Sequence, residues 1–349
     1  MTGQTAGSNR SRFFDWIILA AVVAVLVAYW LLSVSRKSHE PIRLMIYAFS
    51  TQEEVLNREV FPAFEAAWEA ENEHDLIIEA VFGPSGTLAR QIVLGAPADV
   101  AIFSNVQHVN WLKVGKKVSI GTEPLEVSYT PIVIVVRPGN PHNIGSFADL
   151  AQSGLRLVHA DPRSSGVGEW ALLAEYGSAL FETGDQEEAV RQVKDIWQNV
   201  CVLTSSARAT LTLFELGAGD AMLTYEQDAR LAQLRNVPLE IVVPERTIIA
   251  HHVAVLVDDN LTSNERLAAE AFMHYIESDA GQEALTRCCL RSIVDGENAS
   301  PPVLRPFTVS DLGGWPHIYS ELIEGIWQAE IEPRLDVEAA GNLINPATE

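Results

Sequence analysis

The chain has 349 residues, enough for two ordinary domains, and its 48% hydrophobic and 20% charged residues are typical of a folded protein. The formal net charge of −22 argues against nucleic acid or an anionic membrane surface as the main partner. Because a negative protein does not attract a small anion over long range, any anion site here must work through short, desolvated hydrogen bonds.

An apolar run over residues 13–34 follows a polar N-terminus, 1–12. As a helix, this run would span about 33 Å, which matches a bilayer core. Aromatic residues near its outer end favour the membrane interface. A Ser-Val-Ser sequence at its end leaves a cleaved signal peptide as the alternative. We expect an uncleaved transmembrane helix in the inner (cytoplasmic) membrane, a linker over 35–41 and a periplasmic remainder.

Strand-like and helix-like segments alternate from residue 42 onward. The pattern predicts strands at 42–47, 76–82 and 99–103, and helices at 52–71 and 87–94. This rhythm is typical of an α/β protein with a mostly parallel sheet, whose ligand crevice lies at the carboxyl ends of the strands. Two polar loops, Ser50-Thr51 and Ser85-Gly86, follow such strand ends.

Two long β runs, 129–137 and 246–257, interrupt this alternation, and the first ends in a Pro-Gly-Asn-Pro turn. Between them we predict strands at 155–159 and 199–203, with helices starting near Trp170 and Thr210. We interpret the long runs as crossover strands that act as a hinge between two lobes around a cleft. The predicted division is 42–130 and 246–331 for lobe 1, 131–245 for lobe 2, and 332–349 for a tail.

The loop Asp-Pro-Arg-Ser-Ser-Gly-Val-Gly-Glu-Trp at 161–170 connects one predicted strand to an alanine-rich helix. The first N–H groups of a helix have no intrahelical partner, and small residues let an oxyanion approach them. The serine hydroxyls add further donors. The loop therefore predicts either a local anion cradle or an ordinary capped helix.

Other motifs point to no chemistry. The G-x-G-x-x-A match at 166–171 stands too far from its strand to be a dinucleotide fingerprint. His251 and His252 are neighbours in a strand, so they point to opposite faces and make a poor metal pair. Three cysteines without C-x-x-C spacing exclude a disulfide framework, and we expect reduced thiols. Without a nucleophile–base pair or a metal set, we expect neither an enzyme nor a cofactor.

Five segments in order resemble the periplasmic sulfate- and thiosulfate-binding proteins, the solute receptors of ABC importers with a two-lobed type II periplasmic binding protein fold. The Gly-Pro-Ser-Gly turn at 83–86 is similar to that family's Gly-Gly-Ser-Gly. The sequence at 164–170 is similar to its Ser/Thr-Ser-Gly-Gly-Ala-Arg-Trp. The remaining matches are the crossover at 128–141, the segment at 207–220 and the tail at 307–315.

The resemblance implies that an inorganic oxyanion, most often sulfate or thiosulfate, is held without a counter-cation and passed to an ABC permease. Helix N-terminal N–H groups and hydroxyls would hold it. Carried over to this chain, the ligand-binding residues are Ser50, Thr51, Ser85 and Gly86 in the first lobe, and Ser164, Ser165, Gly166, Val167, Ala207, Arg208 and Tyr225 in the second.

Four positions depart from that family pattern. Thr51 replaces an aspartate, Val167 a glycine, Glu169 an arginine and Tyr225 an indole-donating tryptophan. These changes leave open molybdate, tungstate or a phosphate-like anion as ligand. They also leave open a second class of function, a membrane-anchored sensor or partner-binding module with a changed or lost ligand.

Overall fold

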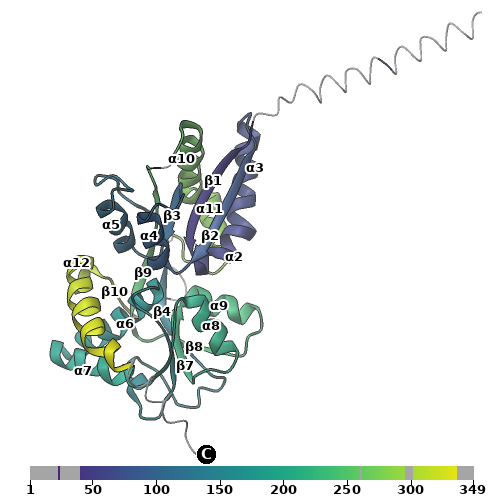
Figure 1. Cartoon of the computed structure of the whole chain (residues 1–349). Helices are drawn as coiled ribbons and strands as arrows, with labels where there is room; N and C mark the ends of the chain where they lie inside the picture. Colours follow the sequence, from purple (N-terminus) through teal and green to yellow (C-terminus); the bar gives the residue numbers. More distant parts are fainter. Residues whose placement is uncertain (1–22, 24–39, 260, 295–301, 336–349) are drawn as a thin grey trace, which may run out of the picture.

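The computed structural model describes residues 40–259, 261–294 and 302–335, together with Val23. These residues form two α/β lobes, one above the other in Figure 1, with strands β4 and β9 running between them. The mixed sheet has the order β2-β1-β3-β9-β4-β7-β5-β6, with β8 and β10 attached to β4 and β9. The predicted two-lobed fold class is confirmed.

The first three strands pair in parallel, with β1 between β2 and β3. Their bounds are β1 Ile42–Phe49, β2 Leu76–Gly83 and β3 Val100–Phe103. Every residue of β3 is buried, which explains its continuous apolar sequence. The helices around them are α3 Phe61–Glu71, α4 Ser85–Val93, α5 Val106–Val114, α10 Ser263–Glu277 and α11 Asp279–Arg287.

A second set of parallel strands follows the same pattern, with β5 between β6 and β7. The strands are β5 Leu157–Ala160, β6 Val200–Thr204 and β7 Ala221–Tyr225, and β8 Glu240–Val242 pairs antiparallel with β4. The helices are η3 Ala148–Ala151, α6 Gly166–Thr183, α7 Gln186–Trp197, α8 Ala207–Glu215 and α9 Glu226–Leu234. The predicted strands at 155–159 and 199–203 therefore lie where the pattern placed them.

Strand β4 (Leu125–Val136) changes partners along its length. Its first half pairs antiparallel with β9 (Arg246–Leu256), and its second half pairs with β7. In β9, His252 is buried whereas His251 is part-exposed, so the two side chains point to opposite faces as predicted. The lobe boundaries at 130/131 and 245/246 stay a prediction.

The first helical segment differs from the prediction. A continuous helix was expected over 52–71, but the segment consists of η1 Ser50–Gln52, α2 Glu53–Val55, a π-helical turn Leu56–Val60 and then α3. Pro62 sits in the first turn of α3. Because proline has no N–H, the i→i−4 ladder cannot continue there, and the hydrogen bonds shift to wider spacing.

The C-terminal elements contact both halves of the molecule. They are β10 Arg305–Phe307, η5 Ser310–Leu312, α12 Trp315–Ile318 and the π-helical η6 Tyr319–Ile331. Tyr319 packs edge-on against Trp111 of α5, with ring centres 5.7 Å apart. Trp327 packs against Trp197 of α7 at 5.6 Å. This segment thus bridges helices of both lobes, although the prediction groups it with lobe 1.

Among the residues that the structure describes, no helix combines the length and apolar character needed to cross a membrane. The predicted anchor at 13–34 lies outside those residues, apart from Val23. The three cysteines are free thiols, as expected.

Candidate functional site

Six loops at the carboxyl ends of parallel strands meet where the two lobes face each other. They follow β1, β2 and β3 in the upper part and β5, β6 and β7 in the lower part (Figure 1). Five of them carry polar or small residues next to a helix start: Ser50–Gln52, Pro84–Gly86, Ser104–Asn105, Ser165–Val167 and Ser206–Arg208. This is where an α/β sheet places a ligand.

The predicted anion loop is a helix N-terminus in the structure. Helix α6 begins at Gly166, four residues before the predicted start at Trp170, and Ser165 is its N-cap. The carbonyl of Asp161 accepts from the N–H groups of Ser164 and Ser165, which closes the turn ahead of the helix. The Ser165 side chain makes no capping bond. The first N–H groups of α6 are therefore available to an anion.

The other helix starts at the site differ in their caps. Pro84, the N-cap of α4, makes no side-chain hydrogen bond, so the start of α4 resembles that of α6. At α8, the Ser206 hydroxyl accepts from the N–H of Ala209. Ala207 remains the first residue of that helix, with its N–H at the open end. The N-termini of α4 and α8 therefore both keep backbone N–H groups that have no acceptor within the helix.

Ser85 is a hydrogen-bonding centre of the first lobe. Its Oγ lies 2.9 Å from Nδ1 of His108 and accepts from the N–H of Ser104 at 3.1 Å. Only 2% of its surface is exposed. The direction of the Ser85 hydroxyl is therefore set by α5 and the end of β3.

The lobes touch at this point. The N–H of Gly86 donates to the Ser164 carbonyl at 3.1 Å, and the indole of Trp170 donates to the Ser104 carbonyl at 2.8 Å. The Ser164 hydroxyl donates to the Ser205 carbonyl within the second lobe, away from the anion position. Of the predicted ligand-binding groups, the Gly86 N–H and the Ser164 hydroxyl are thus already bonded to protein.

Gly166 marks the closest approach of the lobes. A Cβ built on it would overlap the Ser104 side chain and lie 3.5 Å from Cβ of Ser85. Because no side chain fits between them, only glycine allows α6 to meet the first lobe in this arrangement. Ser85, Ser165 and Gly166, all predicted from sequence, are brought together.

Several buried polar atoms around this contact have no hydrogen-bond partner. They are Thr51 Oγ1, both amide atoms of Gln52, Glu169 Oε1, Tyr225 OH, Gln227 Oε1 and His252 Nε2. Folded proteins satisfy nearly all such groups, so a cluster of them at one place indicates a polar ligand or ordered water. This cluster lies at the predicted anion site.

The η1 turn joins the site from the first lobe. The Thr51 carbonyl accepts from the Gln227 amide of α9 at 3.3 Å, and α8 packs against η1. Ser50 is part-exposed beside the fully buried Thr51. Burial raises the pKa of Asp228, and the nearby Arg208 guanidinium partly offsets that rise. Arg208 thus adds a positive charge near this edge.

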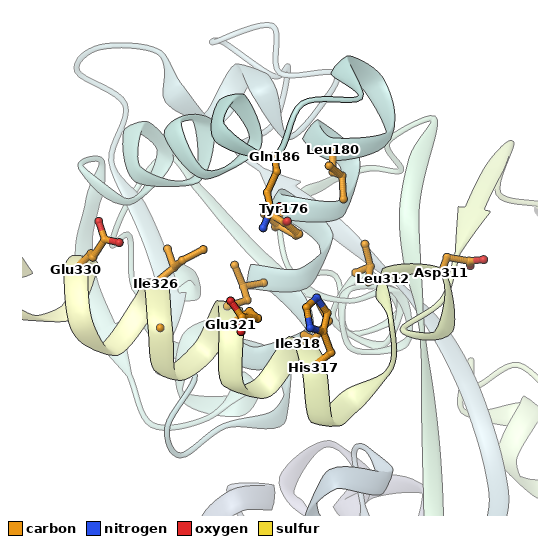
Figure 2. Close-up of a pocket in the computed structure, with 12 residues that line it drawn as sticks. Tyr176, Leu180, Gln186, Asp311, Leu312, His317, Ile318, Glu321, Ile326 and Glu330 are labelled. Carbon is orange, nitrogen blue, oxygen red and sulfur yellow. The ribbon is translucent and has the colours of Figure 1, made fainter.

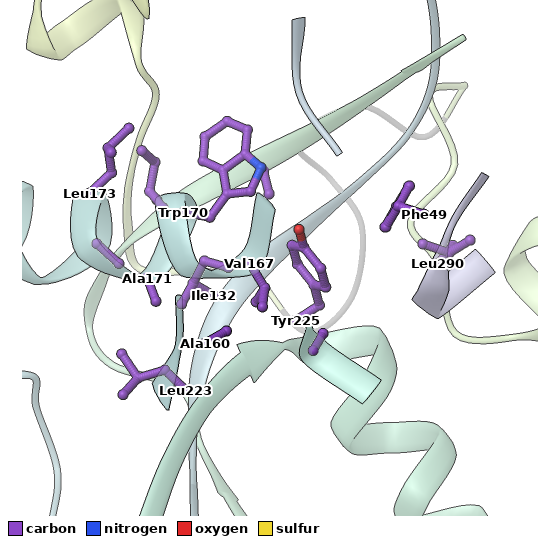
Figure 3. Packing of buried hydrophobic residues seen from close by; sticks show 14 of the residues in the cluster. Phe49, Ile132, Ala160, Val167, Trp170, Ala171, Leu173, Leu223, Tyr225 and Leu290 are labelled. Atoms are coloured by element: carbon purple, nitrogen blue, oxygen red, sulfur yellow. The ribbon is translucent and has the colours of Figure 1, made fainter. Parts of the chain in front are cut away.

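Val167 and Tyr225, two of the departures from the family pattern, belong to one buried apolar cluster with Trp170 (Figure 3). Burial raises the pKa of Tyr225 well above its ordinary value, although Ser104 lies near its hydroxyl and opposes the rise. Tyr225 is therefore neutral, and its hydroxyl can donate or accept. The side chain of Val167 occupies space that a glycine would leave open.

His252 of β9 packs against Tyr225, one of the predicted site residues. Its ring packs 4.7 Å from Phe49 and 5.2 Å from Tyr225, and its Nδ1 lies 3.0 Å from the Ser128 hydroxyl. Burial lowers the pKa of His252 to about 3, with a smaller contribution from His251. His252 is thus a neutral polar group and not a counter-charge for an anion.

A second hollow, of about 370 Å³, lies between α6 and the C-terminal helix (Figure 2). Its lining includes the carboxylates of Asp311, Glu321 and Glu330. Negative charge from three carboxylates repels an oxyanion. The contact between the lobes around Gly166 therefore remains the better candidate for an anion site.

Sequence reasoning missed four residues of the site: Ser104, Asn105, His108 and Gln227. The signal for the first two was present, since Ser-Asn directly follows the predicted strand 99–103, as Ser-Thr follows the first strand. Glu169 was singled out only as a departure from the family pattern. In the structure it accepts from the Asn105 amide at 2.6 Å and lies 3.4 Å from His108.

Comparisons with known proteins agree with this geometry. A family model described as bacterial extracellular solute-binding protein matches residues 46–288. A sulfate-binding protein of Salmonella typhimurium is 33% identical over 275 residues, covering 72% of this chain and 82% of that protein. One from Synechococcus elongatus is 25% identical and covers 94% of this chain and 98% of that protein.

Among solved structures, the sulfate-binding protein SubI from Mycobacterium tuberculosis H37Rv aligns with a TM-score of 0.73. The alignment covers 80% of this chain and 99% of that one at 24% identity. At this identity the likeness concerns the fold, and it agrees with the two-lobed arrangement seen here.

Proposed function

The chain belongs to the bacterial extracellular solute-binding proteins, and we propose that it binds a tetrahedral oxyanion of the sulfate class between its lobes for delivery to an ABC importer. Relatives matched over 82% and 98% of their own length are named sulfate-binding proteins, and others matched over 74% and 84% are named thiosulfate-binding proteins. As in a binding protein, the proposed site holds its ligand by hydrogen bonds and carries out no chemical conversion.

The observation that supports the ligand proposal is that α4 and α6, whose N-termini have no side-chain cap, begin next to each other where the lobes touch. Hydrogen bonds to a charged ligand contribute roughly 1.5–3 kcal/mol each. About five of them would exceed the roughly 8 kcal/mol of micromolar binding, leaving a margin for desolvation. We propose Thr51, Ser85, Ser165, Gly166 and Val167 as the main contributors, with Ala207 and Tyr225 at the second-lobe side.

Sulfate and thiosulfate are the favoured ligands. Val167 can donate its N–H as glycine would, and its side chain packs into the buried apolar cluster. Molybdate and tungstate are the alternatives that a binding test distinguishes. The neutral Tyr225 hydroxyl can accept from a protonated anion, which keeps a phosphate-like ligand as an alternative.

A second candidate function is a sensor or partner-binding module with a changed ligand. The observation that favours it is Glu169, a buried carboxylate within the first turn of α6, which opposes a bound dianion. A transport receptor should be captured by its permease when the oxyanion is present, whereas a sensor should not.

The direct test is calorimetry on the full-length chain in mild detergent with sulfate, thiosulfate, molybdate, tungstate and phosphate, and with chloride as the control. We expect one-to-one binding of sulfate or thiosulfate at micromolar affinity and a rise in melting temperature. Failure of every oxyanion to bind would sink the receptor proposal and favour the partner-binding function.

We further propose that residues 13–34 tether this receptor to the outer face of the cytoplasmic membrane. Their length and apolar character support the proposal. The test is fractionation of cells: the chain should pellet with membranes and resist extraction by high salt and by alkaline carbonate. Recovery as a shortened, freely released protein would instead indicate a cleaved signal peptide.

A further inference from the structure

Three buried side chains link the proposed ligand serine to the opposite lobe. Ser85 Oγ lies 2.9 Å from Nδ1 of His108, and Nε2 of His108 lies 3.4 Å from Oε2 of Glu169. None of the three is more than 2% exposed. Ser85 lies in α4 and His108 in α5, both in the first lobe, whereas Glu169 lies in α6 of the second lobe. The chain of contacts is therefore complete only when the lobes meet.

The Ser85 hydroxyl has one hydrogen to donate, and its direction depends on His108. The Ser104 N–H already donates to Ser85 Oγ. If Nδ1 of His108 is unprotonated, the Ser85 hydroxyl donates to it and can only accept from a ligand. If Nδ1 carries a proton, Ser85 accepts from both neighbours, and its hydroxyl is free to donate to an oxyanion.

Glu169 decides where a neutral His108 carries its proton. Asn105 Oδ1 caps the His108 N–H at 3.3 Å, which turns its amide Nδ2 towards Glu169 Oε2 at 2.6 Å. Oε2 of Glu169 is therefore an acceptor at the point where it meets Nε2 of His108. A carboxylate beside Nε2 in turn favours the proton on Nε2, which leaves Nδ1 as an acceptor. In that state Ser85 donates to His108 and not to the ligand.

The remaining charged and titratable groups around His108 do not replace this partner. Arg90 of α4 lies over the Trp111 ring, 5.1 Å from its centre, and the same ring packs edge-on against His108. Tyr319 packs against the same indole. Burial, and then Glu169, raise the pKa of Tyr319 to about 12, so it is uncharged near neutral pH. Glu169 is the charged group that His108 meets from the second lobe.

We propose that the His108–Glu169 pair takes up one proton from solvent when a fully deprotonated oxyanion binds. With that proton, both ring nitrogens of His108 donate, the Ser85 hydroxyl turns to the anion, and the negative charge of the pair is cancelled. His108 and Glu169 are thus positioning residues that make a site suited to neutral or protonated groups accept a dianion. The inference rests on the proposed function and adds to it one proton that the protein binds together with the anion.

Calorimetry with sulfate between pH 6 and 9, in two buffers of different ionisation enthalpy, tests this on the full-length chain. Sulfate itself carries no proton in this range, so any proton taken up goes to the protein. We expect uptake approaching one proton per sulfate and an affinity that falls about tenfold per pH unit in the upper part of the range. Sulfate binding with no uptake and a flat pH profile overturns this inference and leaves the proposed function standing. No binding of any oxyanion overturns both.

Glu169→Gln separates this role from a purely structural one. When its amide is turned so that the oxygen accepts from Asn105 and the nitrogen faces Nε2 of His108, the ring proton moves to Nδ1 and the Ser85 hydroxyl is freed without proton uptake. We expect a pH-independent sulfate affinity that exceeds the wild-type value about tenfold at pH 8.5. The control His274→Gln alters a histidine that is 84% exposed and should keep the wild-type slope. Weaker binding of Glu169→Gln at every pH, or an unchanged slope, overturns the proposal.

Discussion

Two buried histidine–glutamate pairs share helix α6 but lie in different regions of the molecule. Glu169 faces His108 across the cleft, and Glu175 faces His159 inside the second lobe. In both pairs the carboxylate oxygen lies 3.4 Å from the histidine Nε2. The pairs differ at the other end of the imidazole. Nδ1 of His108 meets the Ser85 hydroxyl, whereas Nδ1 of His159 meets a backbone carbonyl.

That difference decides which pair can respond to a ligand. A carbonyl only accepts, so Nδ1 of His159 always donates to Ala160, and Glu175 is further held by the Trp197 indole at 2.9 Å. A hydroxyl donates or accepts, so the His108 ring can exist in two arrangements. The His159–Glu175 pair is a fixed structural element, and the His108–Glu169 pair is adjustable because it ends on a hydroxyl, that of the proposed ligand residue Ser85.

We expect the largest effect on the His108–Glu169 pair from a substitution that keeps the two lobes apart. Gly166→Asp places a side chain where Ser104 already lies, so the closed arrangement cannot form. We expect oxyanion affinity to fall more than about 100-fold by calorimetry, with the melting temperature nearly unchanged because the clash exists only between lobes. Gly121→Asp, with no atom within 4 Å of a built Cβ, is the matched control. Normal binding by Gly166→Asp would show that the site has been placed wrongly.

Disrupting the His159–Glu175 pair should lower the stability of the fold and leave the sulfate affinity almost unchanged. Glu175→Leu leaves His159 and the Trp197 indole without their buried partner, which lowers the free energy of unfolding by about 3–5 kcal/mol. Urea unfolding measures the loss, and the sulfate affinity of the folded variant should change by less than about threefold. Glu182→Leu, an exposed position of the same helix, should stay within about 0.5 kcal/mol of the wild type. Equal effects of the two variants would contradict the comparison.

Ser85→Ala tests the hydroxyl that makes the His108–Glu169 pair adjustable. Loss of a hydrogen bond to a charged ligand corresponds to about 1.5–3 kcal/mol, so sulfate affinity should fall by roughly ten- to a hundredfold. His108 then has no hydroxyl to direct, so the pH dependence of the remaining binding should also weaken. Ser119→Ala, at an exposed position, is the control. An affinity equal to the wild type would remove Ser85 from the site.

His252, like His108, lies next to a serine hydroxyl, that of Ser128. Among the described residues, no carboxylate faces it as Glu169 faces His108. The folded pKa of His252, about 3, lies below the ordinary value of 6.5, so below pH 6.5 the unfolded chain binds a proton that the folded chain does not. Stability should fall by about 1.4 kcal/mol per pH unit from pH 6.5 downward. Denaturant titrations from pH 7 to 5 should show a shallower slope for His252→Gln. Identical slopes would mean that burial does not keep this ring neutral.

Much of the fold follows from local sequence patterns. Alternating strand and helix segments, the two long β runs and the polar loops after strands at 42–47 and 76–82 were all predicted, because backbone preferences and apolar periodicity act over a few residues. The break in the predicted helix at 52–71 was missed, although Pro62 supplied its cause. Of the site, Ser85, Ser165 and Gly166 were predicted, since small and hydroxyl residues stood at helix starts.

The tertiary structure decided how those loops meet. Asn105 and Glu169 are 64 residues apart, yet they form a 2.6 Å hydrogen bond because α5 and α6 approach each other across the cleft. No local pattern encodes such a distance, which depends on how β4 and β9 place one lobe against the other. The sequence by itself determined the strands, the helix starts and an anion-binding class of site. Only the packing of the lobes decided that a carboxylate and an imidazole stand behind Ser85, because a hydrogen bond needs its partners within about 3 Å whatever their separation in the chain.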